Sequence, residues 1–237
     1  MKFKILSILV ASLAVSTSAS AVELIANGDF SAGFSGFTSE YTAVTYGQPN
    51  SLFPEGTYTV GSNPNASHDS FVVKPEGNPM LLANGAESPQ PGSEKALLLY
   101  NGFAPGTGQY VFSADVMNIC CKFEFPGAQS SILFQISQAG VNSGIFQTIA
   151  SFTTSPPGDA GLVNHVVQPS FSLLAGDFIF RIIDAIGAPS GNDFAVDNLS
   201  IQAAAVPGPI VGAGFPGLLM ALGGLVALAR RRRNQAV

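Results

Sequence analysis

Residues that could do acid–base chemistry are few in this chain of 237 residues, which contains only two histidines, His68 and His165. General acid–base or nucleophilic catalysis needs a basic side chain held beside a nucleophile or a second carboxylate. Ser67, His68 and Asp69 are adjacent in the sequence, but we expect them in a loop as solvated turn residues. His165 is expected on a strand as a surface residue. Two histidines so placed make no transition-metal pattern, and we therefore expect a protein that is not an enzyme.

The cysteines, Cys120 and Cys121, are adjacent. If the chain is exported, it meets an oxidising compartment where paired thiols usually close. Neighbouring cysteines can join only through an eight-membered ring, which differs from ordinary disulfide geometry. We predict a vicinal disulfide that stiffens the turn after a strand ending near Ile119, with two free thiols or an intermolecular bridge as the alternatives.

Aromatic side chains that could contact a ligand occur in and beside the loop-rich region 48–92. Sugar-binding surfaces usually offer flat Trp or Tyr faces, because the C–H groups of a pyranose ring stack against them. The chain has no Trp, five Tyr and 18 Phe, and most Phe residues recur at strand spacing, as core residues do. We therefore take Tyr46, Phe53 and Tyr58 as the candidate ligand-binding residues, on loops carried by a rigid scaffold.

Strands are the elements that must position these residues. Segments of strand length, rich in Phe, Val, Ile and Thr and bounded by Gly, Pro, Asn and Ser, occur at 57–60, 80–83, 108–119, 131–139, 144–154, 177–186 and 193–203. Within 108–119, Tyr110, Phe112, Ala114 and Val116 alternate with other residues, which suits one buried face. No stretch of the body shows a long apolar period of 3.6 residues, which would indicate a helix. We predict an all-β fold, a two-sheet antiparallel sandwich over residues 22–203.

The two ends of the chain have the patterns of targeting segments. Residues 1–21 combine Lys2 and Lys4 with a short apolar run and small residues up to Ala21, as a secretory signal peptide does. Residues 204–209 form a linker, and residues 210–229 are uncharged over the length of a single transmembrane helix. The tail 230–237 begins with four arginines and is expected in the cytoplasm. The alternatives are a retained N-terminal anchor and a buried hydrophobic tail.

Between these ends the chain is acidic. Residues 22–209 contain four Lys and Arg and all fifteen Asp and Glu, which gives a formal charge of −11. Nucleic-acid binding needs clustered positive charge and is excluded on this ground, as is attraction to an anionic membrane surface. Divalent cations and neutral polymers suit such a surface better.

The combination of ends resembles the bacterial PEP-CTERM proteins. The resemblance is carried by Val206, Pro207, Gly208 and Pro209, followed by the Gly-rich apolar segment and the arginine cluster; Gly208 stands where the commonest motif has Glu. It implies that residues 206–209 are a sorting motif recognised by an exosortase, a membrane-embedded thiol transpeptidase-like enzyme. The protein would be held in the inner membrane by its C-terminus before processing, and would reach the cell surface or the extracellular space after sorting.

The body resembles galactose-binding-like jelly rolls in the segments 23–41, which contains Asn-Gly-Asp-Phe, and 191–201, which contains Asp-Asn. The resemblance implies an antiparallel jelly roll whose first and last strands pair. It would bring Asp29 and Asp197 together, with backbone oxygens near Asn27, as a structural calcium site of hard oxygen ligands. Many related modules have Glu at the position of Ser31, so the alternative is that both aspartates are turn and edge residues.

Three functions remain open for the exported body. The first is a non-catalytic structural or adhesive protein of the extracellular polysaccharide matrix or cell surface. The second is a specific carbohydrate-binding module, with extracellular polysaccharide as its partner. The third is a hydrolase acting on polysaccharide, for which the sequence offers no catalytic constellation.

Overall fold

The computed structural model describes residues 21–75, 77–86, 95–121, 129–138, 144–154, 160–186, 192–204, 222–228 and 230–232. The chain divides into two compact units, Met1–Ala203 and Ala204–Val237, and each is described by itself. The predicted signal peptide, up to residue 20, lies outside the described residues, as do the sorting-motif residues Val206, Pro207, Gly208 and Pro209.

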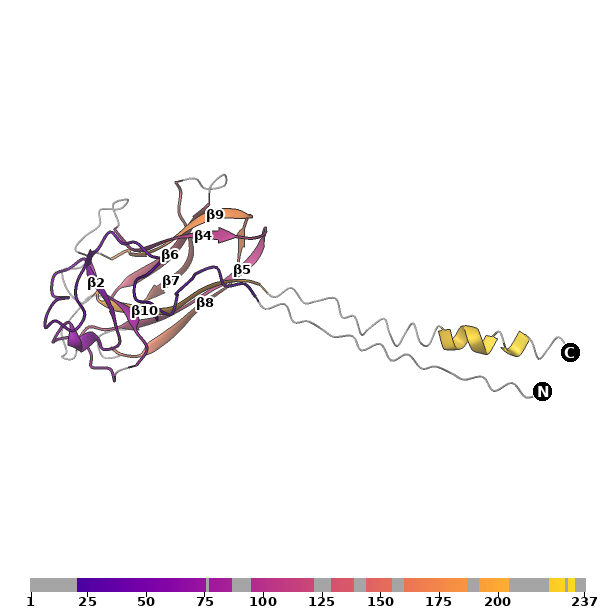
Figure 1. Ribbon diagram of the computed structural model, residues 1–237, viewed down its shortest axis with the longest axis horizontal. Coiled ribbons are helices and arrows are strands. Elements are labelled where there is room, and N and C mark those ends of the chain that lie inside the picture. Colours follow the sequence, from indigo (N-terminus) through magenta and orange to yellow (C-terminus); the bar gives the residue numbers. More distant parts are fainter. Residues whose placement is uncertain are drawn as a thin grey trace. The chain divides into compact units, whose positions relative to one another are not determined.

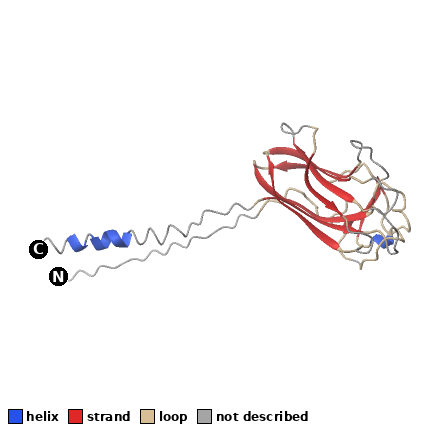
Figure 2. Cartoon of the chain, turned by 180° about the vertical axis from the view of Figure 1, so that it is seen from behind, coloured by secondary structure: helices blue, strands red, loops and turns tan. Residues whose placement is uncertain are grey.

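The first unit is a two-sheet β-sandwich (Figures 1 and 2). Its elements are β1 Thr42–Ala43, β2 Thr57–Gly61, the short helix η1 Pro64–Ala66, β3 Met80–Asn84, β4 Ala96–Ala104, β5 Gly108–Asn118, β6 Ser131–Gln138, β7 Gln147–Thr153, β8 Val163–Leu173, β9 Gly176–Asp184 and β10 Phe194–Ala203. The six-stranded sheet has the order β1-β2-β3-β10-β5-β8, and the four-stranded sheet has the order β4-β9-β6-β7.

The predicted all-β sandwich is confirmed. The strands expected from the sequence coincide with β2, β3, β5, β6, β7, β9 and β10, with ends shifted by a few residues at most. Strand pairing is antiparallel apart from β1, which runs parallel to β2. Sequence reasoning gave no strand at 96–104, where β4 lies, because its leucine run does not alternate and its Asn-Gly pair resembles a turn.

The main core lies between the two sheets and follows from strand alternation. On β5, Tyr110, Phe112, Ala114 and Val116 are buried, as their spacing predicted. Phe112 packs against Phe134 and Phe180 of the facing sheet, with ring centroids 4.8 and 5.7 Å away. Burying one such side chain stabilises a fold by about 1.5–3 kcal/mol, so this face holds the sheets together.

A second apolar cluster lies on the outer side of the six-stranded sheet. Its residues are Leu52, Phe71, Met80, Leu82, Met117, Ile119, Cys120 and Ala195. Leu82, Ala195 and Met117 pair across β3, β10 and β5, and their neighbours in sequence face the main core. Leu52 and Phe71 come from the segments 44–56 and 62–73 that flank β2, which we call the loop cover. The loop cover therefore buries the outer face of this sheet near one end.

The opening segment was expected to be the first strand, and this expectation was wrong. Residues 23–41 are mostly turns, in which Asn27 and Phe30 have positive φ angles. The segment does run beside the last strand: Glu23 bridges Gln202, and Leu24 N–H donates to the carbonyl of Ile201 at 2.8 Å. A chain of turns replaces a regular strand because left-handed residues break the extended pattern.

The second unit contains helix at residues 222–228 and 230–232. Most of the predicted membrane segment 210–229 lies outside the described residues. Within the described part of the chain, no helix reaches the length and apolarity needed to cross a bilayer.

Candidate functional site

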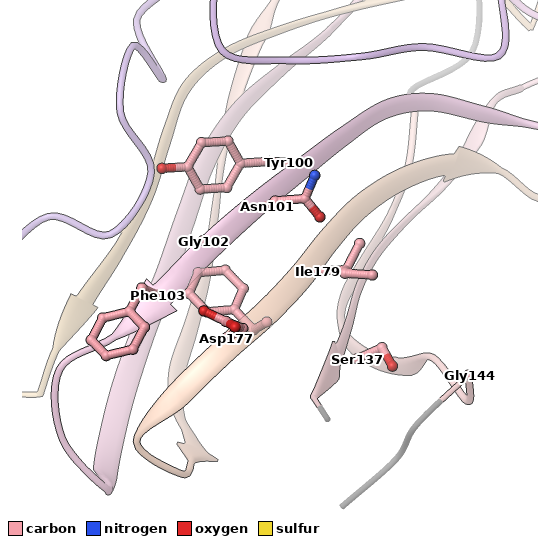
Figure 3. A pocket seen from close by; sticks show the side chains of 9 residues that line it. Tyr100, Asn101, Gly102, Phe103, Ser137, Gly144, Asp177 and Ile179 are labelled. Atoms are coloured by element: carbon pink, nitrogen blue, oxygen red, sulfur yellow. The ribbon is translucent and has the colours of Figure 1, made fainter. Parts of the chain in front are cut away.

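A hollow of about 620 Å³ lies on the outer face of the four-stranded sheet (Figure 3). Its walls come from β4, β9, the end of β6 and residue 144. The lining residues are Tyr100, Asn101, Gly102, Phe103, Ser137, Gly144, Asp177, Phe178 and Ile179. Small-molecule sites in proteins commonly measure roughly 300–1,000 Å³, so the hollow is large enough to hold a ligand.

Strand alternation turns four of the lining side chains outward. Asn101 and Phe103 on β4 are exposed, and so are Asp177 and Ile179 on β9. Asn101 pairs with Ile179, and Phe103 pairs with Asp177. Because Ser137 of β6 pairs with Ile179 from the other side, the row continues across three strands.

The floor of the hollow is fixed to the core. The side chain of Phe178 occupies the space beside Gly102, where an added Cβ would collide with the ring. On the core side of β4, the Tyr100 hydroxyl donates to the carbonyl of Leu24 at 2.9 Å and accepts from the Ala26 N–H at 3.2 Å. The outward-facing groups are therefore held on a rigid surface.

The lining combines apolar and hydrogen-bonding groups. Phe103 is 61% exposed and Ile179 is 40% exposed, so both offer apolar area to a ligand. The amide of Asn101 and the carboxylate of Asp177 stand beside them in Figure 3, whereas Ser137, which also lines the hollow, is only 5% exposed. Such a surface suits a ligand with a flat apolar face and a rim of hydroxyl groups.

A polar row crosses the same sheet next to the hollow. Arg181 Nε donates to Gln135 Oε1 at 2.8 Å, and Gln135 Nε2 donates to Thr148 Oγ1 at 3.1 Å. The Arg181 guanidinium carbon lies 3.8 Å from the centroid of the Phe146 ring, a cation–π contact. This row places a fixed positive charge on an otherwise acidic body.

The structure separates the three aromatic residues that the sequence singled out. Phe53 is 67% exposed, as expected. Tyr46 was expected to be exposed but is half-buried: it packs against the second cluster and accepts from the Asn63 N–H at 3.0 Å. Tyr58 is also half-buried, and its ring lies 4.4 Å from that of Phe34 beside the main core. None of the three lines the hollow.

The two histidines differ in their surroundings. His68 was expected in water but is 8% exposed, and its Nδ1 accepts from the Ser70 N–H at 3.2 Å. Burial lowers the pKa of His68, an effect that the charge of Asp69 partly offsets. His165 lies on β8, as expected, and its Nδ1 is 2.7 Å from Asp115 Oδ1. Its side chain is largely exposed.

The residues of the predicted calcium site lie in one region of the fold. The Asn27 side chain holds a turn: its Nδ2 donates to the carbonyls of Gly33 and Ser35. Burial raises the pKa of Asp197 to about 6, and the charges of Asp115 and Asp29 add to the rise. Among the described residues, no three His, Cys, Asp or Glu side chains form a group that could hold a metal ion. Calcium binding remains a prediction.

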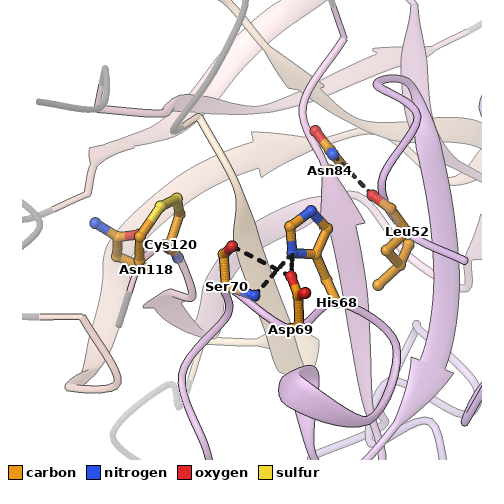
Figure 4. Close-up of a disulfide and its surroundings, with 8 residues drawn as sticks. Leu52, His68, Asp69, Ser70, Asn84, Asn118 and Cys120 are labelled. Atoms are coloured by element: carbon orange, nitrogen blue, oxygen red, sulfur yellow. Dashed lines mark hydrogen bonds and ion pairs between the residues drawn. A yellow bond between two sulfur atoms is a disulfide. The ribbon is translucent and has the colours of Figure 1, made fainter. Parts of the chain in front are cut away.

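The cysteines lie just beyond β5, beneath the loop cover (Figure 4). The Sγ atoms of Cys120 and Cys121 are bonded to each other. Cys120 is buried and forms a β-bridge with Phe71, and its N–H donates to Asn118 Oδ1 at 3.0 Å. The pair therefore sits where the loop cover meets the sheet, and its state in solution remains to be tested.

Two buried carboxyl groups lie at the C-terminal end of β9 and immediately before β10. Asp184 is 5% exposed and Asp193 is 4% exposed. Burial raises the pKa of Asp184 to about 6, and it raises the pKa of Asp193 to about 7. Asn192 Nδ2 donates to Asp184 Oδ2 at 2.9 Å, whereas Asp193 Oδ1 has no hydrogen-bond partner in the described part of the chain.

Sequence reasoning missed the hollow. No strand was predicted at 96–104, and neither Asn101 nor Phe103 was singled out as a candidate ligand-binding residue. A hint exists in Tyr100, Gly102 and Ala104 alternating with Asn101 and Phe103, once 96–104 is taken as a strand.

No known family model matches the chain, and no curated protein matches it. Among solved structures, the CBM22-1 xylan-binding domain of Paenibacillus barcinonensis Xyn10C is 10% identical, covers 81% of this chain and 100% of that one, and has a TM-score of 0.45. The CBM22-1–CBM22-2 tandem of the same protein is 12% identical, with coverages of 84% and 50% and a TM-score of 0.48. The family 16 carbohydrate binding module-2 is 14% identical, with coverages of 75% and 98% and a TM-score of 0.38. All three are distant from this chain.

Proposed function

We propose that the body is a non-catalytic polysaccharide-binding module, which contacts a glycan through the outer face of its four-stranded sheet. The observation that supports this most directly is the hollow itself. Exposed Phe103 and Ile179 stand beside Asn101 and Asp177 on two paired, rigid strands.

The chemistry of a sugar chain fits this arrangement. A pyranose ring has an apolar face of C–H groups, which stacks on an aromatic ring, and hydroxyl groups at its edge, which bond to amides and carboxylates. The body's charge of −11 disfavours polyanionic chains, so the proposed ligand is a neutral polysaccharide. Arg181, beside the hollow, would bond hydroxyl groups further along the chain.

The proposed architecture is a jelly roll. The chain alternates between the sheets from β3 to β6, crosses back at β8 and closes with β9 and β10, so that the eight strands β3 to β10 form two four-stranded layers. This strand order supports the jelly-roll arrangement.

The proposed setting is the extracellular matrix. An N-terminal signal pattern and a Val-Pro-Gly-Pro tail support export, membrane anchoring by the C-terminus and sorting by an exosortase. A matrix protein of this kind would hold polysaccharide outside the cell.

Affinity gel electrophoresis of the full chain in mild detergent tests the binding. The gels contain soluble xylan, galactomannan or hydroxyethylcellulose, and the expected result is slower migration in at least one of them. Phe103→Ala should remove most of the retardation, since truncating an aromatic anchor commonly costs more than about 1 kcal/mol. Leu162→Ala, which truncates an apolar residue 59% exposed outside the hollow, is the control. Retardation unaffected by Phe103→Ala would exclude this surface.

A further inference from the structure

A stack of three aromatic rings rises from the second cluster to the surface of the loop cover. The buried Phe71 ring lies against the His68 imidazole, with centroids 4.2 Å apart and an interplanar angle of 13°. The imidazole in turn lies against the Phe53 ring, at 5.4 Å and 5°. Phe53 is 67% exposed, so the top of the stack is a flat aromatic face open to solvent.

Hydrogen bonds hold the backbone around Phe53 from two neighbouring segments. Asn84 Nδ2, from the end of β3, donates to the carbonyls of Leu52 and Phe53 at 2.7 and 3.1 Å. The Leu52 N–H donates to the carbonyl of Ser67 at 3.0 Å, and the Asp69 N–H donates to Asn50 Oδ1 at 3.0 Å. Figure 4 shows Leu52, Asn84 and His68 together in this part of the loop cover.

This organisation distinguishes Phe53 from a chance exposed side chain. A single apolar residue on a surface needs no explanation by itself. A ring already fixed in orientation, however, loses little conformational freedom when a ligand stacks on it, which favours binding. Burial also lowers the pKa of His68, so the stack beneath the ring stays uncharged near neutral pH, as suits an uncharged ligand.

Hydrogen-bonding groups lie in the turns beside Phe53. The Asp69 side chain is 75% exposed, and Asn50 and Ser70 also lie in the adjoining turns. An aromatic face with such groups in the neighbouring turns suits the apolar face and the hydroxyl groups of a pyranose.

The ring and the hollow face opposite directions. The loop cover lies on the outer side of the six-stranded sheet, and the hollow lies on the outer side of the four-stranded sheet. They also lie toward different ends, since Figure 1 shows β2, which the loop cover flanks, and the tip of β4 far apart along the sandwich. One sugar unit cannot touch both.

We propose that Phe53 and its stack form a second glycan-contact site, which makes the domain a bivalent cross-linker of neutral polysaccharide chains. This inference rests on the proposed function of the hollow. Two sites on opposite faces hold two chains, or two distant parts of one chain, through one domain. Once one site is occupied, the effective concentration of sugar units at the other site rises, and this increases the overall affinity.

Light scattering from mixtures of the full chain with soluble xylan, galactomannan or hydroxyethylcellulose tests cross-linking. The wild-type chain should give a scattering maximum at an intermediate ratio of protein to polysaccharide, because excess protein saturates the chains separately. Phe53→Ala should lower this maximum at least about tenfold, the effect of losing one aromatic anchor, and leave affinity retardation by the hollow within about threefold. Phe53→Tyr should restore it, and Leu162→Ala should not change it.

The outcomes separate the two proposals. Retardation of the wild-type chain with scattering unchanged in Phe53→Ala would overturn the second site and leave the first. Absence of retardation in all three gels would overturn the proposed function and this inference with it. Scattering by protein alone, together with the circular dichroism and melting midpoint of each variant, controls for self-association and for misfolding.

Discussion

The stability of the sandwich should depend on pH through Asp193. Burial raises the pKa of this carboxyl from its ordinary 3.8 to about 7, so the folded state binds its proton more tightly than the unfolded state does. The resulting stabilisation is fully present below pH 4 and is lost as the pH rises through about 7. Each pKa unit corresponds to about 1.4 kcal/mol, so up to about 4 kcal/mol of the free energy of unfolding disappears over this range.

Replacing Asp193 by Asn tests this reasoning. The amide resembles a protonated carboxyl in shape and keeps an oxygen to accept from the Gly85 N–H. At pH 8 the variant should therefore be more stable than the wild type by up to about 4 kcal/mol, or about 10 °C in the melting midpoint. At pH 5 the difference should fall to roughly 1.7 kcal/mol, because the unfolded carboxyl is then ionised about one pH unit above its pKa of 3.8 while the folded one keeps its proton. Asp184, whose pKa is raised to about 6, will leave a smaller pH dependence in the variant.

Thermal unfolding of the full chain followed by circular dichroism, at intervals from pH 4.5 to 8.5, measures the effect. Asp177→Asn is the matched control, because it removes the same charge from an exposed position. It separates the local effect from the general repulsion of a body with a charge of −11. If Asp193→Asn and Asp177→Asn give the same midpoint at pH 8, the buried carboxyl is not destabilising and the reasoning is refuted.

Three further predictions concern the cysteines, calcium and the tail. Thiol titration of the denatured, unreduced protein should find no free thiol if Cys120 and Cys121 are bonded in solution; two thiols would contradict this. If calcium binds at Asp29 and Asp197, it should raise the melting midpoint relative to chelator, because an ion bound only by the folded state stabilises it, and Asp197→Ala should abolish the rise; equal midpoints would remove the site. In a host with the matching exosortase, the intact mass of the exported protein should lack the arginine cluster; a species ending at Val237 would leave only a membrane anchor.

The fold could be predicted where burial on one face imposes a simple alternation. The alternating spacing of apolar residues predicted β5 correctly, because a half-buried strand must alternate buried and exposed side chains; the buried ones are Tyr110, Phe112, Ala114 and Val116. The leucines of β4 concealed the same alternation. The prediction of a strand in the opening segment 23–41 was wrong because Asn27 and Phe30 take left-handed conformations, which give turns in place of the expected strand.

The site was harder to predict than the fold. The hollow depends on the pairing of Phe103 with Asp177 and of Asn101 with Ile179, residues more than seventy positions apart in the chain. Nothing local in the sequence tells which face of such a strand the other sheet will cover. The prediction for Tyr46 failed for the reverse reason. It precedes a Gly- and Pro-rich segment that looks exposed, but it packs against the second cluster on the outer face of the six-stranded sheet and is half-buried there.

The most direct test of the account is methyl NMR of the full chain, labelled at the isoleucine δ1-methyl groups, during titration with a hexasaccharide of the polysaccharide that retards it. Ile179 lines the hollow, whereas Ile186 is similarly exposed, at 39%, beyond the far end of β9. If the hollow holds the glycan, the Ile179 signal should shift progressively with ligand, the Ile186 signal should stay in place, and Phe103→Ala should remove the Ile179 shift. A ligand that is bound while Ile179 does not move would contradict the claim that this face of the sandwich holds the glycan.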